Sequence, residues 1–139
     1  MDSTGQRTVE SAPGGVDAAL YYRWVTVVTA GLVLVQAVLA GRGWFVDLDL
    51  IDLHGIVGNL VFLVVIGQAV LAFLARSRGG VGWLEFGLCG VLVVLVVAQI
   101  GLGYSGRETA GAAAWHVPNG VLIFGIATAL MALGFKAKS

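Results

Sequence analysis

The chain has 139 residues, of which 58% are hydrophobic and only 12% are charged. Globular domains are about half apolar and about a quarter charged, so this chain has too little polar surface for a water-soluble fold. Its formal net charge is zero, which gives no indication of nucleic acid as a partner. The single cysteine, Cys89, cannot form an internal disulfide, and because no Cys-x-x-Cys-His motif occurs, covalent c-type haem attachment is excluded.

Residues 1–20 are polar and rich in Gly and Ser. Such a segment cannot bury enough apolar surface to offset the entropy lost on ordering. We therefore expect a flexible cytoplasmic tail over 1–20 and a membrane-embedded bundle over 21–136.

Four apolar runs follow, at about 22–41, 54–75, 84–104 and 116–135. Crossing the hydrocarbon core takes about 20 helical residues, and in lipid the backbone polar groups of each span must be paired internally. The predicted fold class is an all-α membrane protein, a bundle of four transmembrane helices. We expect outer loops at about 43–53 and 105–115, the first lying along the membrane interface.

The positive charges indicate an orientation for these helices. Lys and Arg are enriched in cytoplasmic segments. If the N-terminal tail is inside, two cations, Arg42 and Arg107, lie outside and six lie inside. The inner six are Arg7, Arg23, Arg76, Arg78, Lys136 and Lys138. We expect a multi-pass protein of the cell membrane with both termini cytoplasmic.

The two histidines occupy matching places in the second and fourth runs. His54 and His116 each open a predicted helix, and each is followed four residues later by glycine (Gly58 and Gly120), then by leucine and phenylalanine at the same spacings. Both predicted helices run from outside to inside. The two imidazoles should therefore lie at one depth near the outer face.

A second matched pair extends this pattern to the first and third runs. His54 and His116 are 62 residues apart, and Gln36 and Gln99 are 63 apart. The first two helices thus match the last two. Because each repeat has two spans, the halves are parallel and should be related by a pseudo-two-fold axis along the membrane normal. Such an axis would make one two-sided site from one histidine of each half.

Two imidazoles facing each other across such an axis are typical axial ligands of a haem iron. Gly58 and Gly120 lie one turn inward of each histidine, on the same helical face. Their missing side chains would leave room for the edge of a porphyrin, or would let the helices approach closely. A histidine at a helix entrance can also be no more than an interfacial polar residue. The matched pair favours ligation, because ionisable groups in membrane spans tend to be functional.

The glutamines and the outer arginines are further candidates for the site. The buried amides of Gln36 and Gln99 need partners, which could be a histidine ring N–H, a backbone carbonyl or each other. Arg42 and Arg107 could pair with the haem propionates, or could be solvated loop charges. Gln68 lies too near the inner end to reach the site and is predicted to join helices.

These motifs resemble one four-helix half of the haem A synthases, over roughly 22–135. That family has one His on the second and one on the fourth helix, and Gln-x-x-Leu-Gly-type segments in the odd helices, similar here to those beginning at Gln36 and Gln99. The resemblance implies that His54 and His116 are axial ligands of haem b. The catalytic half of the synthases has Glu three residues before its first histidine, where this chain has Ile51 and Ala113. Haem A synthesis is therefore not implied. The chain is also similar to small bacterial four-helix membrane proteins of unknown function.

Three functions are compatible with these features to different degrees. The first is a b-type cytochrome with one non-covalent haem b per chain, which passes electrons to a redox partner that the sequence does not name. Catalysis is less favoured, because bis-histidine iron has no open position. The second is a non-haem membrane subunit or assembly factor whose histidine pair is structural. The third, a transporter or proton carrier, is disfavoured because no charged residue lies mid-membrane. A homodimer or a larger membrane complex fits the first two.

Overall fold

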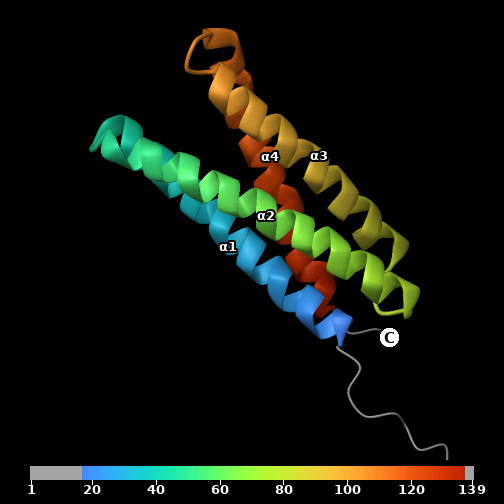
Figure 1. Cartoon of the computed structure of the whole chain (residues 1–139). Helices are drawn as coiled ribbons and strands as arrows, with labels where there is room; N and C mark the ends of the chain where they lie inside the picture. The colour runs from blue at the N-terminus through green and yellow to red at the C-terminus, as the bar shows by residue number, and fades with distance from the viewer. Residues whose placement is uncertain (1–16, 137–139) are drawn as a thin grey trace, which may run out of the picture.

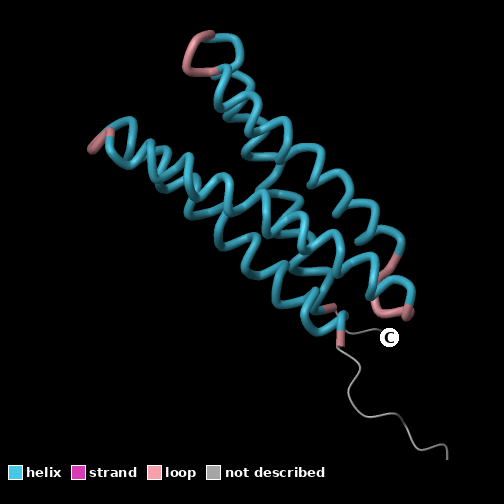
Figure 2. Tube along the Cα trace, in the orientation of Figure 1, coloured by secondary structure: helices cyan, strands magenta, loops and turns pink. Residues whose placement is uncertain are grey.

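A computed structural model of the chain describes residues 17–136 and contains four α-helices with no strand among those residues. They are α1 (Ala18–Phe45), α2 (Asp49–Ser77), α3 (Trp83–Ser105) and α4 (Ala110–Phe135), which follow one another in alternating directions (Figure 1). The connections between them are short, as the tube in Figure 2 shows. All four helices are long and apolar enough to cross a membrane. The predicted fold class is confirmed.

Side chains and glycines define the ends of the helices. The Asp17 carboxylate accepts hydrogen bonds from the backbone N–H groups of Ala19 and Leu20, each at 3.1 Å, and so caps α1. After α2 the chain turns at Gly79, whose φ of 74° is the left-handed conformation that glycine adopts readily. There Gly80 N–H donates to Ala75 C=O at 2.8 Å, which satisfies a terminal carbonyl of the helix.

The helices form a ring in which each packs against two others. The backbones approach closely between α1 and α2, α2 and α3, α3 and α4, and α4 and α1, whereas the backbones of the diagonal pairs α1–α3 and α2–α4 stay apart within the described residues. Helices α2 and α4, which carry the two histidines, are therefore diagonal to each other. Any contact between their side chains crosses the middle of the bundle.

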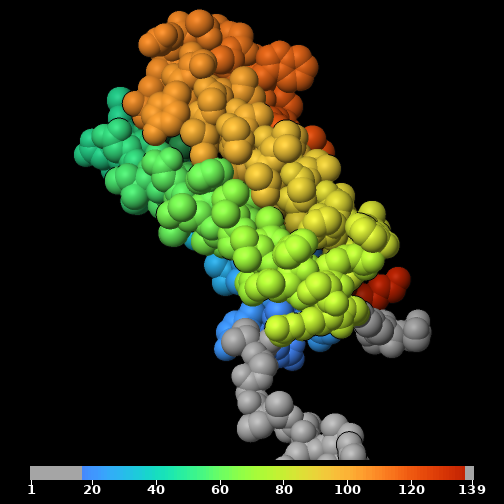
Figure 3. All heavy atoms as spheres, turned by 45° about the vertical axis from the view of Figure 1, so that its right-hand side comes forward, coloured from blue at the N-terminus to red at the C-terminus, as the bar shows by residue number. Residues whose placement is uncertain are grey.

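The packed core lies at one end of this ring. Over roughly half of the bundle's length, from the end at which α1 begins and α4 ends, apolar residues from all four helices are buried together, among them Tyr22, Val65, Leu92 and Leu130. Toward the opposite end, which carries the α1–α2 and α3–α4 connections, the buried positions of α1 stop at Val33, apart from Gly43. In the other helices they lie no further out than Val61, Val96 and Ile123. There the α1–α2 pair and the α3–α4 pair diverge (Figure 1), and their tips form two lobes in Figure 3.

The helices extend further than the apolar runs predicted. The expected outer loops at 43–53 and 105–115 are wrong in extent. Only residues 46–48 separate α1 from α2, and only residues 106–109 separate α3 from α4. Asp49 and Asp52 begin α2, where acidic side chains favour the helix N-terminus. The alanine-rich stretch before Trp115 begins α4, as expected of the best helix former.

The N-terminal boundary also differs from the prediction of a tail over 1–20. Residues 18–20 form the first turn of α1, with the Ala18 side chain buried. The rest of the predicted tail, at 1–16, lies outside the described residues.

Candidate functional site

The two histidines meet across the diagonal of the bundle. The ring centroids of His54 on α2 and His116 on α4 are 6.0 Å apart, with an angle of 67° between the ring planes. Both side chains are half-buried. Neither histidine opens its helix, because α2 begins at Asp49 and α4 at Ala110. With a rise of about 1.5 Å per residue, His54 lies about 7.5 Å from the start of α2 and His116 about 9 Å from the start of α4. The two histidines therefore still lie at similar depths from the same end of the bundle.

Each imidazole is held by the neighbouring helix of its own repeat. Nδ1 of His54 is 3.1 Å from the backbone carbonyl oxygen of Gln36 on α1, and Nδ1 of His116 is 3.1 Å from that of Gln99 on α3. The same bond thus occurs in both halves with the same length. The internal repeat seen in the sequence is a repeat of hydrogen-bond geometry.

These bonds assign the tautomer of both rings. A carbonyl oxygen can only accept a hydrogen bond, so Nδ1 must carry the proton in each histidine. In a neutral imidazole the lone pair is then on Nε2. Both rings consequently have the form in which Nε2 can bind a metal while Nδ1 is fixed by a backbone oxygen.

The side-chain amides of the two glutamines have other partners than their backbone carbonyls, which bond the imidazoles. Nε2 of Gln36 donates to the backbone carbonyl of His54 at 3.0 Å, which was one of the partners left open by the sequence. A Cβ added at Gly58 would be 3.7 Å from Nε2 of Gln36, and one at Gly120 would be 3.1 Å from Nε2 of Gln99. Glutamine amides therefore lie beside both glycines, and room for a porphyrin edge at these positions stays a prediction. The glycines allow close helix contact.

Asn119 is part of this site and was not singled out from the sequence. Its side-chain amide donates to Oε1 of Gln99 at 2.6 Å and to the backbone carbonyl of Leu95 at 3.0 Å. It lies on the same face of α4 as His116, three residues later, which was the available signal. The first half has no counterpart, because Val57 occupies the equivalent place. Asn119 fixes the position of α4 against α3 beside the histidine.

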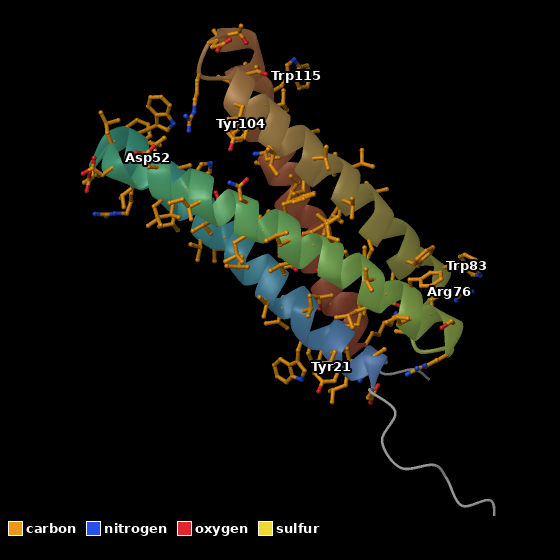
Figure 4. All side chains as sticks on the ribbon, in the orientation of Figure 1. Tyr21, Asp52, Arg76, Trp83, Tyr104 and Trp115 are labelled. Carbon is orange, nitrogen blue, oxygen red and sulfur yellow. The ribbon has the colours of Figure 1, made fainter. Side chains whose placement is uncertain are left out.

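Of the two arginines expected at the outer face, the structure brings Arg107 close to α2. The guanidinium of Arg107 lies over the ring of Tyr104, 5.7 Å from its centroid, and its Nη2 atom is 4.0 Å from where a Cβ of Gly55 would lie. Arg107 thus reaches from the α3–α4 connection toward α2 at Gly55, the residue that follows His54 in the sequence. In Figure 4 Tyr104 points toward the α1–α2 pair, whereas Trp115 points away from the bundle. Arg42 is exposed near the end of α1.

A separate polar cluster lies in the packed half of the bundle. Thr29 Oγ1 donates to Gln68 Oε1 at 2.6 Å, and Gln68 Nε2 is 3.7 Å from Cys89 Sγ, which is 3.7 Å from Tyr22 Oη. All four side chains are buried. Gln68 therefore joins α1, α2 and α3, as the prediction of an interhelical contact required. The cluster is remote from the histidines along α2.

Taken together, the four spanning helices define a multi-pass membrane protein with a four-helix bundle. A model of a family of unknown function, DUF6220, matches residues 36–102, just under half of the chain. The matched segment holds Gln36, His54 and Gln99 and ends before α4 with His116. No curated protein and no solved structure matches the chain. These comparisons show no link to the haem A synthases, so that resemblance stays a prediction.

Proposed function

We propose that the protein is a membrane b-type cytochrome that holds one haem b per chain between His54 and His116 and takes part in electron transfer. The observation that carries the proposal is the pair of identical 3.1 Å bonds from Nδ1 to a backbone carbonyl. They leave two Nε2 lone pairs, one from each half of the bundle, available at one depth. Bound haem would supply reversible one-electron chemistry there.

The separation of the rings fits two ligands of one metal. A metal–imidazole bond of about 2.0–2.1 Å plus about 1 Å from nitrogen to ring centre, taken on both sides, gives about 6 Å between centroids. The observed separation is 6.0 Å. The interplanar angle of 67° is compatible with this, because two imidazoles that would bind one metal from opposite sides need not be coplanar.

The donor set favours a metal that brings ligands of its own. No group of three or more His, Cys, Asp or Glu side chains that could hold a metal ion occurs within residues 17–136. A bare zinc ion needs four ligands, usually at least three of them from protein. A porphyrin supplies four nitrogen ligands and needs only the two axial positions, which is what the histidine pair can provide.

The surroundings of the histidines suit an amphipathic planar group. The two helix pairs diverge at this end, and nearly all burial lies further in. Arg107 lies close to α2 at this end of the bundle, where its guanidinium could pair with haem propionates. Arg42, exposed near the end of α1, is a weaker candidate for the same role.

The remaining parts of the proposal concern setting. If His54 and His116 hold the haem iron, it would have no open position, which favours electron transfer over oxygen chemistry. The excess of Lys and Arg on the side of the two termini supports cytoplasmic termini in the cell membrane, and the site would then lie in the outer half of the bilayer. The redox partner would then approach from the outer side, and assembly into a homodimer or larger complex is compatible with this placement.

The test is a spectrum of the full-length protein purified after expression with added haem precursor. We expect a Soret band and low-spin bands that sharpen on reduction, both lost in the variants His54→Ala and His116→Ala. Asn59→Ala is the control, because Asn59 lies exposed on α2 and should leave the spectrum unchanged. Absence of a Soret band, or an unchanged band in both histidine variants, would end the proposal.

One observation favours a second candidate, a non-haem subunit with a structural histidine pair. Each ring already joins two helices through its bond to a carbonyl, which contributes about 0.5–1.5 kcal/mol in general. This candidate predicts a normally folded protein without pigment. It also predicts that joint replacement of both histidines by leucine leaves folding intact, since removing both polar groups leaves only carbonyls already paired within their helices.

A further inference from the structure

Gly103 lies on α3 directly against the imidazole of His116. A Cβ atom added there would be 3.1 Å from Cε1 and 3.5 Å from Nδ1 of His116. In the helix, the carbonyl of Gln99 is also the acceptor for the N–H of Gly103, four residues later. A ring that bonds this carbonyl therefore lies against residue 103, and its approach depends on what side chain is present there.

We infer that Gly103 is a positioning residue, whose missing side chain sets the distance and rotation at which His116 bonds Gln99 and so directs the Nε2 atom of His116 into the site. The inference rests on the proposed function, since the positioned group is an axial ligand. A methyl group at 3.1 Å would require the ring to move by a few tenths of an ångström. A larger side chain would require the ring to leave the carbonyl.

The first half of the bundle shows that glycine is not a general requirement of this arrangement. Ala40 follows Gln36 by four residues, as Gly103 follows Gln99. His54 nevertheless forms its 3.1 Å bond to the Gln36 carbonyl. The two imidazoles are therefore inequivalent, and only the ring on α4 is set by a glycine on its neighbouring helix.

Gly101, two residues before Gly103, provides a matched control. A Cβ atom there has no neighbour within 4 Å, and the residue is exposed on the outside of the bundle. Substitutions at Gly101 and Gly103 change the same helix by the same atoms. Any difference between them arises from what residue 103 faces.

The experiment uses full-length protein in detergent, titrated with haemin, with alanine and leucine at each of the two positions. Gly103→Ala should shift the g-values of the low-spin ferric signal, which depend on the orientation of the axial rings, and should weaken haem binding only slightly. Gly103→Leu should weaken binding by about tenfold or more and abolish the bis-imidazole signal. The variants at Gly101 should match the wild type. Wild-type behaviour of Gly103→Leu, or an equal loss in Gly101→Leu, would overturn the inference.

A haem-free measurement separates this inference from the proposed function. In protein labelled with ¹⁵N-histidine, the hydrogen-bonded Nδ1–H of His116 should shift in Gly103→Ala and disappear in Gly103→Leu, while the signal of His54 stays unchanged. If the wild type takes up no haem but this pattern holds, the proposed function fails and the positioning of His116 stands. An unchanged His116 signal in Gly103→Leu refutes the positioning itself.

Discussion

The buried contact between Thr29 and Gln68 should couple α1 to α2 with a measurable energy. Both side chains are 1% exposed, and the Oγ1–Oε1 distance is 2.6 Å, at the short end for hydroxyl donors. The perturbation is Gln68→Leu, Thr29→Val and the two together. Either single change leaves one polar group in the apolar interior, whereas the double change removes both.

The expected magnitude follows from the chemistry of the pair. Leaving a buried polar group unpaired costs about 1–3 kcal/mol, but a threonine in a helix can bond a carbonyl of its own preceding turn. Interhelical hydrogen bonds in membranes contribute about 0.6 kcal/mol on average and about 1.7 kcal/mol at most. Because this bond is short and fully buried, we expect a coupling energy of about 1 kcal/mol.

The assay is reversible unfolding in mixed micelles, followed by circular dichroism, for the four proteins of a double-mutant cycle. Thr128→Val is the control partner for Gln68→Leu, because the Thr128 hydroxyl bonds only carbonyls of its own helix, those of Phe124 and Gly125. That pair should be additive within about 0.3–0.5 kcal/mol. If the Thr29 cycle is as additive as the control, the buried cluster does not join these helices energetically.

Three further changes have expected outcomes. Gly79→Ala should destabilise the protein by about 1–2 kcal/mol, because a φ of 74° is unfavourable for residues with a Cβ; the same micelle unfolding measures it, and no loss would contradict the assigned turn. Asn119→Ala should cost about 1–3 kcal/mol by leaving Oε1 of Gln99 without its donor, checked by faster proteolysis of the α3–α4 half. Gly120→Ala should destabilise more than Gly67→Ala, because only the former meets a neighbour, at 3.1 Å; equal thermal midpoints would argue against the close contact.

The four spans were predictable because hydropathy and length alone identify helices that cross a bilayer. The ends of the helices were not, because apolar runs mark the hydrocarbon core and helices continue beyond it. Asp49 and the alanines before Trp115 are polar or small, yet favour helix by charge–dipole attraction and by propensity. Both histidines consequently lie inside their helices rather than at the start.

The meeting of His54 and His116 was predictable from their matched spacing and direction. The hydrogen-bond acceptors of their rings were not predictable. They are the backbone carbonyls of Gln36 and Gln99, and every residue carries a carbonyl. Residue identity therefore gives no signal for such a bond. The haem itself remains a prediction, because neither the fold nor the family match tests it.

The location of the packed core at one end of the bundle has a consequence for how the molecule is made. Tight packing begins inward of Val33 and Val61, so the spans can assemble without help from anything held between the histidines. We expect the four helices to insert and fold first, and any cofactor to bind afterwards at the end of the bundle that carries the histidines. Binding would then require no unfolding, only entry between the α1–α2 pair and the α3–α4 pair.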